Sequence, residues 1–156
     1  MLKVKPEILN PCDNTYEALK LLVNNSIYAQ QKYCNNSNKN IKAYLKEFCT
    51  IKLCTARQTG HTSAILRLCT EYFDKSLVLY NTIEMARKIR EYYNSLYNED
   101  IISGTITNFH SVYRGYEFDA IFIDCASFVC SSKLDCIYDE LGPCLNQKEK
   151  FVILMQ

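Results

Sequence analysis

The sequence lacks a strong excess of either charge. It has 18 Lys and Arg against 17 Asp and Glu, a formal net charge of +1, which predicts no strong overall attraction to nucleic acid or membrane. It also lacks an apolar run close to the roughly 18 residues that a membrane span needs. The first residues contain no apolar core segment of the kind found in signal peptides. We therefore expect a cytoplasmic protein that does not bind membranes.

Paired metal-ligand motifs and tryptophan are missing as well. The nine cysteines include no CxxC pair, and the two histidines, His61 and His110, are not at ligand spacing from a cysteine pair, so we do not expect a zinc site. Several cysteines lie in apolar runs, where a thiol packs as a small hydrophobic group, and reduced thiols indicate a cytosol. The absence of Trp beside 12 Tyr, with abundant Asn, Lys and Ile, is typical of an AT-rich genome such as that of a virus, which would place the protein in the host cytoplasm.

The sequence does contain short apolar segments without polar alternation, separated by helical patterns. The segments predicted to be strands are 51–55, 76–80, 101–106, 120–124 and 151–155. The segments predicted to be helices are 15–33, 41–48, 62–73, 82–96 and 134–145. Strands of this kind indicate a mainly parallel sheet covered on both faces. We predict a single α/β domain over 1–156, with a helical N-terminal extension (1–50) and a three-layer, five-stranded core (51–156).

The segment 51–68 has the order of strand, glycine turn and helix that a phosphate-binding loop needs. Its centre, 55–62, reads Thr-Ala-Arg-Gln-Thr-Gly-His-Thr. Backbone N–H groups from Thr59 to Thr62 would form an anion-binding nest. Gly60 permits close approach of the backbone to phosphate, and Thr62 stands where a hydroxyl binds magnesium.

Two residues depart from the usual pattern of such loops, GxxxxGK(S/T). Thr55 replaces the first glycine. This position tolerates another small residue. His61 replaces the lysine that reaches between the β- and γ-phosphates. Histidine is shorter than lysine and ordinarily close to neutral at pH 7, so we expect much of that phosphate contact to be lost.

Asp124 ends an apolar strand and is the predicted partner of this loop. An acid at the end of a buried strand beside the loop strand is where a magnesium-organising carboxylate belongs; a cap of the following turn is the alternative. The next residue is Cys125, where hydrolytic members of helicase-like groups carry glutamate. The expected base for activating water is therefore absent.

Two segments resemble known ATPases. Residues 56–63, Ala-Arg-Gln-Thr-Gly-His-Thr-Ser, resemble the RQxGKTT loop of phage terminase large-subunit ATPases. Residues 113–124 resemble the stretch that precedes the acidic motif in terminases and superfamily 2 helicases. The resemblance covers 51–156 and implies a RecA-like P-loop core that binds ATP or ADP with Mg²⁺.

The same resemblance implies the roles of the site residues. Asp124 would organise magnesium together with Thr62, and Arg57 would stabilise charge on the γ-phosphate, with simple surface solvation as the alternative for Arg57. The residues expected to bind the nucleotide are Arg57, Gln58, Thr59, Gly60, His61, Thr62 and Ser63.

Other candidates have plainer interpretations. A basic cluster, Arg87, Lys88 and Arg90, is expected to be the solvated face of its helix. Four tyrosines are candidates for stacking on single-stranded bases, with packing in the core or at its rim as the favoured alternative. They are Tyr92, Tyr93, Tyr97 and Tyr113.

Three functions remain open. The first is an active small ATPase of terminase or helicase type coupled to DNA or RNA, and another is a purely structural interaction module. The favoured hypothesis is a P-loop domain with impaired or absent hydrolysis, because single electrostatic groups are worth about 3–4 kcal/mol in a transition state and both the lysine and the glutamate are absent. Such a protein would be a viral accessory or regulatory factor in nucleic-acid metabolism. Its expected partners are another protein or a second copy of the chain, with nucleic acid as a further candidate.

Overall fold

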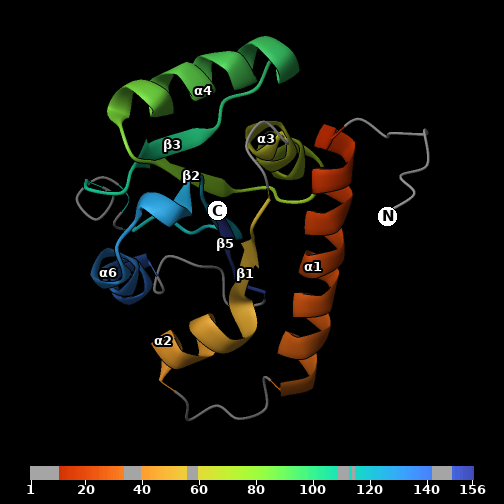
Figure 1. Ribbon diagram of the computed structural model, residues 1–156, viewed down its shortest axis with the longest axis vertical. Coiled ribbons are helices and arrows are strands. Elements are labelled where there is room, and N and C mark those ends of the chain that lie inside the picture. The colour runs from red at the N-terminus through yellow and green to blue at the C-terminus, as the bar shows by residue number, and fades with distance from the viewer. Residues whose placement is uncertain (1–10, 34–39, 56–59, 109–112, 114, 142–148) are drawn as a thin grey trace, which may run out of the picture.

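A five-stranded parallel sheet forms the centre of the structure (Figure 1). This computed structural model describes residues 11–33, 40–55, 60–108, 113, 115–141 and 149–156. The strands are β1 (Thr50–Leu53), β2 (Ser76–Tyr80), β3 (Ile102–Thr105), β4 (Ala120–Ile123) and β5 (Phe151–Met155). Their spatial order is β1-β5-β4-β2-β3, and every neighbouring pair is parallel.

The burial of the strands explains their apolar sequences. Every residue of β2, β4 and β5, the three inner strands, is buried. A parallel strand covered on both faces needs apolar side chains at successive positions rather than at alternate ones. The edge strands β1 and β3 carry exposed residues, Lys52 and Ile102. The predicted parallel five-stranded α/β architecture is confirmed.

Helices cover both faces of the sheet and make the fold three-layered (Figure 1). One face packs against α1 (Pro11–Tyr33), α3 (His61–Glu71) and α4 (Ile83–Tyr97). The other packs against α2 (Ile41–Tyr44), the π-helical turn η1 (Leu45–Cys49) and α6 (Ser131–Leu141). A short 3₁₀ turn, η2 (Ala126–Phe128), precedes α6. Among the described residues, no helix combines the length and hydropathy needed to cross a membrane.

The order of the strands corrects one expectation. The strand that ends at Asp124 was expected beside the loop strand, but β5 lies between β1 and β4. The fully apolar β5 fits this inner position because both of its faces are covered. Helix α3 carries the chain from β1 to β2, which lies beyond β5 and β4 in the sheet. The amino end of α3 can therefore approach Asp124 although the two strands are not neighbours.

Helix α1 is tied to the sheet by polar contacts as well as apolar ones. Its side chains Leu19 and Val23 are fully buried in the core cluster. Gln30, only 2% exposed, donates from Nε2 to the Lys150 carbonyl at 2.8 Å and accepts from the Lys150 N–H at Oε1 at 3.0 Å. Ser26 donates to the Phe48 carbonyl at 2.7 Å. The amide of Gln30 thus holds the backbone that leads into β5.

Two of the four candidate tyrosines pack in the core and the basic cluster is solvated, as expected. Tyr93 and Tyr113 are buried, and the Tyr113 hydroxyl donates to the Ser103 carbonyl at 2.6 Å, so core packing is confirmed for these two. The Tyr113 ring lies against Gly104, where a Cβ would come within 2.3 Å of its hydroxyl. Tyr92 is exposed. The basic cluster of α4 is solvated and paired with acids, namely Arg87 with Glu91, Lys88 with Glu84, and Arg90 with Asp100.

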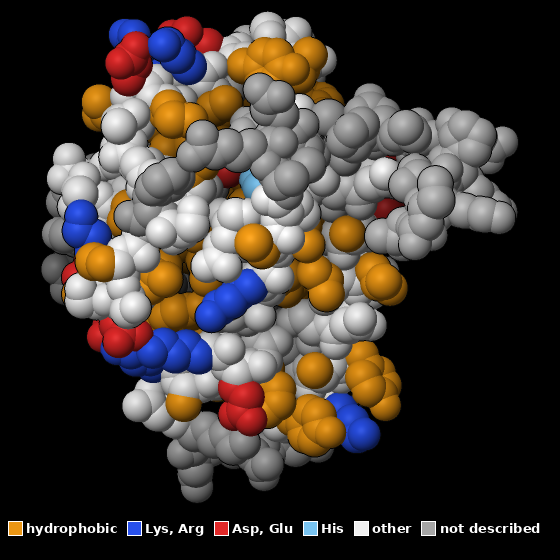
Figure 2. Space-filling view, viewed as in Figure 1, with side chains coloured by type: hydrophobic (Ala, Val, Ile, Leu, Met, Phe, Trp, Pro, Cys, Tyr) orange, Lys and Arg blue, Asp and Glu red, His pale blue; other side chains and the backbone are white. Residues whose placement is uncertain are grey.

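The charge distribution on the surface agrees with the near-zero net charge. Figure 2 shows acidic and basic side chains interspersed on one face, often side by side, between apolar and uncharged polar groups. Two of the ion pairs join η1 or α2 to α6, Lys46 with Asp135 and Lys42 with Asp139. Exposed pairs of this kind contribute little stability, so the packing of the layers depends mainly on the apolar clusters.

The Gln30 contact predicts a measurable loss of stability. Gln30→Leu should lower the free energy of unfolding by about 2 kcal/mol, because it removes two hydrogen bonds to the Lys150 backbone. Gln31→Leu is the matched control, since Gln31 is exposed and donates to the Glu149 side chain at 3.3 Å. Urea denaturation measures both; equal losses for the two variants would contradict the role assigned to Gln30.

Candidate functional site

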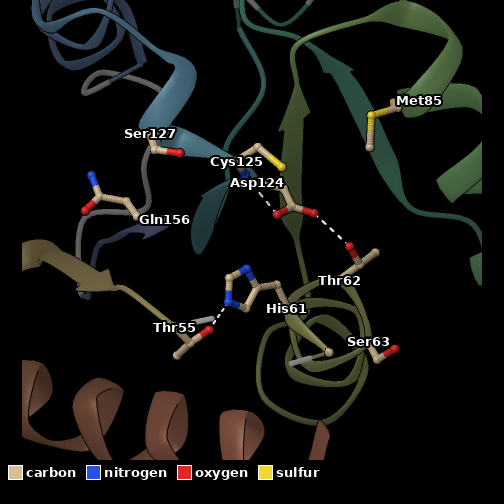
Figure 3. Close-up of a pocket in the computed structure, with 10 residues that line it drawn as sticks. Thr55, His61, Thr62, Ser63, Met85, Asp124, Cys125, Ser127 and Gln156 are labelled. Carbon is tan, nitrogen blue, oxygen red and sulfur yellow. Dashed lines mark hydrogen bonds between the residues drawn. The ribbon is translucent and has the colours of Figure 1, made fainter. Parts of the chain in front are cut away.

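A pocket of about 560 Å³ lies at the carboxyl ends of the strands (Figure 3). The chain leaves β1 toward one face of the sheet through α3 and leaves β4 toward the other face through α6. In open α/β sheets such a divergence creates a crevice in which ligands bind. The residues that line the pocket are Thr55, Gly60, His61, Thr62, Ser63, Met85, Asp124, Cys125, Ser127 and Gln156.

Gly60 forms the turn that begins α3. Its φ of 78° lies in the left-handed region, which glycine adopts without the steric cost of a Cβ. The first helical turn closes with a bond from the Ala64 N–H to the Gly60 carbonyl at 2.9 Å. Gly60 has no side chain with which to cap the helix, and the first N–H groups of a helix have no acceptor within it. They point toward the pocket end of α3 and favour a negatively charged ligand.

Asp124 is held in a fixed orientation directly after β4. It is 2% exposed, and its Oδ2 accepts a hydrogen bond from Thr62 Oγ1 at 2.8 Å (Figure 3). Its Oδ1 accepts from the Cys125 N–H at 2.9 Å, and its own N–H donates to the Leu79 carbonyl at 3.1 Å. The side chain therefore caps the turn, as the alternative interpretation expected, and also contacts the first turn of α3.

His61 contacts Thr55 on the side of the pocket away from the bond between Thr62 and Asp124. Its Nε2 forms a hydrogen bond with Thr55 Oγ1, and the ring reaches from the start of α3 toward the end of β1 (Figure 3). Thr55 is itself tied to the end of β5, because its N–H donates to the Gln156 carbonyl at 3.3 Å. The two residues that depart from the usual loop pattern are thus in direct contact.

The structure brings together most of the residues expected at the site. Gly60, His61, Thr62, Ser63 and Asp124 all line the pocket. The remaining expected residues, Arg57, Gln58 and Thr59, lie outside the described residues.

The pocket also includes residues that the sequence did not indicate. Ser127 lies in η2, and Gln156 follows β5. Met85, in α4, is 41% exposed and lines the pocket. Their positions in the sequence could have identified them. Each lies within a few residues of the carboxyl end of a strand, and in a parallel sheet these ends lie on the same side.

Thr62 and Asp124 supply oxygen atoms of the kind that Mg²⁺ prefers. The Thr62 hydroxyl donates a hydrogen bond to Asp124, which leaves the lone pairs of Thr62 Oγ1 available to a cation. Among the described residues there is no group of three or more His, Cys, Asp or Glu that could hold a metal, so the other ligands would be water and ligand oxygens, as is usual for Mg²⁺.

No protein-family model matches the chain, and no curated protein shows a significant sequence match.

Tyr80 lies at the end of β2, close to Asp124. It is 1% exposed, and within the described part of the chain its hydroxyl has no hydrogen-bond partner. Burial raises the pKa of this phenol, and the charge of Asp124 raises that pKa further. The phenol therefore stays protonated, and its buried hydroxyl costs free energy in the folded state.

Removing this hydroxyl should stabilise the protein. Tyr80→Phe is expected to raise the free energy of unfolding by about 1 kcal/mol, because it deletes a buried polar group without breaking a bond. Tyr93→Phe is the matched control and should lower it by about 1 kcal/mol, since the Tyr93 hydroxyl bonds with Thr70 at 2.8 Å. Thermal or urea unfolding checks both, and an equal loss in the two variants would contradict the assignment for Tyr80.

Proposed function

We propose that the chain is a P-loop NTPase-like domain that binds a magnesium nucleotide and hydrolyses it slowly or not at all. The observation that carries the proposal is the 2.8 Å bond between Thr62, in the first turn of α3, and the buried Asp124. It joins a helix amino end to a carboxylate at the carboxyl edge of a parallel sheet. The three-layer parallel sheet also fits the RecA-like core that the resemblance to terminases and helicases implies.

The phosphates of the nucleotide would bind at the amino end of α3. Gly60 leaves room for close approach, and the N–H groups of the first turn are directed at this end of the pocket. Thr62 and Asp124 would hold Mg²⁺ beside the phosphates, and the ion would offset their negative charge there. Asp124 is itself negative, and no Lys or Arg is among the described lining residues. Nucleotide binding should therefore depend strongly on the divalent ion.

Hydrolysis is expected to be weak because two groups that promote it are replaced. His61 does not supply the permanent charge of a lysine, and Cys125 occupies the position of the water-activating glutamate. No glutamate lines the described part of the pocket. Loss of a single stabilising donor lowers turnover about 10²–10³-fold in well-studied enzymes. A domain of this kind would act mainly by binding, as a viral accessory or regulatory factor in nucleic-acid metabolism that works through a protein partner or a second copy of itself.

Titration with fluorescent ATP and ADP, with Mg²⁺ or with EDTA, tests the proposal. Wild type should bind weakly and only with Mg²⁺, and His61→Lys should bind about tenfold more tightly, because a charged donor replaces a neutral one. Asp124→Asn should lose the dependence on Mg²⁺. Asp119→Asn is the matched control. Asp119 precedes β4, at the amino end of the strand and away from the pocket, and accepts from the Lys75 N–H at 3.0 Å.

The other outcomes of this titration select the alternative functions. Tight Mg²⁺-dependent binding with steady turnover by wild type would indicate an active ATPase of terminase or helicase type. No binding by wild type or by His61→Lys would indicate a structural module and would overturn the proposed function.

A further inference from the structure

The contact between Thr55 and His61 suggests which group could donate to a phosphate in place of the loop lysine. We propose that Thr55 is a positioning residue: its hydroxyl donates to His61 Nε2 and holds the ring with its Nδ1–H directed into the pocket, where it would donate to a phosphate oxygen. A neutral N–H donor would then replace the ammonium group. The identity of the ligand rests on the proposed function, whereas the state of the ring is a property of the ligand-free protein.

Thr55 is well placed to hold the ring because its own position is fixed. Its N–H donates to the Gln156 carbonyl at 3.3 Å, and the Gln156 N–H donates to the Leu53 carbonyl at 2.9 Å. These bonds continue the pairing of β1 and β5 past the ends of both strands. These bonds fix Thr55 at the edge of the sheet. The side chain of His61, at the start of α3, reaches the Thr55 hydroxyl across the pocket (Figure 3).

The direction of the hydrogen bond follows from what the second ring nitrogen faces. A neutral imidazole has one N–H donor and one acceptor nitrogen, and the bond made by one nitrogen fixes the role of the other. Nδ1 faces the side of the pocket where Asp124 lies (Figure 3). A proton on Nδ1 points toward this negative charge, whereas a lone pair there would be repelled by it and by a phosphate. Nε2 is then the acceptor, and Thr55 is the donor.

The proposal also accounts for both departures from the loop pattern together. Glycine at position 55 would have no hydroxyl to orient the ring, and lysine at position 61 would not need one. Thr55 and His61 are therefore expected to work as a pair, in which the effect of changing one depends on the other.

Nitrogen-15 NMR on the full chain tests the state of the ring directly. In long-range ¹H–¹⁵N spectra at pH 8, His61 should show a protonated Nδ1 and a bare Nε2. The chain has only two histidines, so His110→Gln assigns the signals. Thr55→Val should give a mixture of the two tautomers, and Thr55→Ser should restore the wild-type pattern. A protonated Nε2 in wild type, or no change in Thr55→Val, would overturn the proposal.

A double-mutant cycle tests the consequence for binding. In a chain that keeps His61, Thr55→Val should weaken binding of fluorescent ADP with Mg²⁺ about fivefold, and Thr55→Ser should retain wild-type binding. In a chain that carries His61→Lys, Thr55→Val should change binding little. An equal loss in both backgrounds would contradict a role through His61. If neither wild type nor His61→Lys binds nucleotide, the proposed function fails, while the NMR result still decides the role of Thr55.

Discussion

The hydrogen bond from Thr62 to Asp124 is the interaction on which the candidate site depends. Thr62 lies in α3, which follows β1, and Asp124 follows β4, while β5 lies between these two strands. The two residues meet because α3 starts after β1 and carries the chain past the intervening strands to β2. Without this contact, the amino end of α3 and the buried acid would be separate features of the sheet edge. With it, they form two sides of a single pocket.

The pocket combines features that favour binding with features that disfavour turnover. The left-handed Gly60 opens the amino end of α3 to a ligand, and Thr62 and Asp124 offer oxygens to a divalent ion. Cys125, in contrast, brings no carboxylate to the place where water would be activated. In the proposed arrangement, the pairing of Thr55 with His61 would give the site a neutral donor in place of a fixed charge. Under the proposed function, such a site would suit a domain that binds a nucleotide more than one that hydrolyses it quickly.

The sequence predicted the elements of the fold better than their arrangement. The apolar runs 76–80 and 151–155 match β2 and β5 at both ends, because buried parallel strands have continuous apolar sequences. The position of β5 between β1 and β4 was not predicted, since strand order depends on how each crossover packs. The Gly60 turn and Asp124 were found because a glycine turn and a strand-end acid are local signals. The contact of Thr55 with His61 and the exposure of Met85 arise only from tertiary packing.

The position of a bound divalent ion would test the proposed site. Crystals grown with Mn²⁺ and a non-hydrolysable ATP analogue would reveal the ion by its anomalous scattering. The proposed site requires a single strong peak in contact with Thr62 Oγ1 and beside the Asp124 carboxylate, at the amino end of α3. An ion and nucleotide bound elsewhere on the protein, or no peak at this position when the analogue is bound, would contradict it.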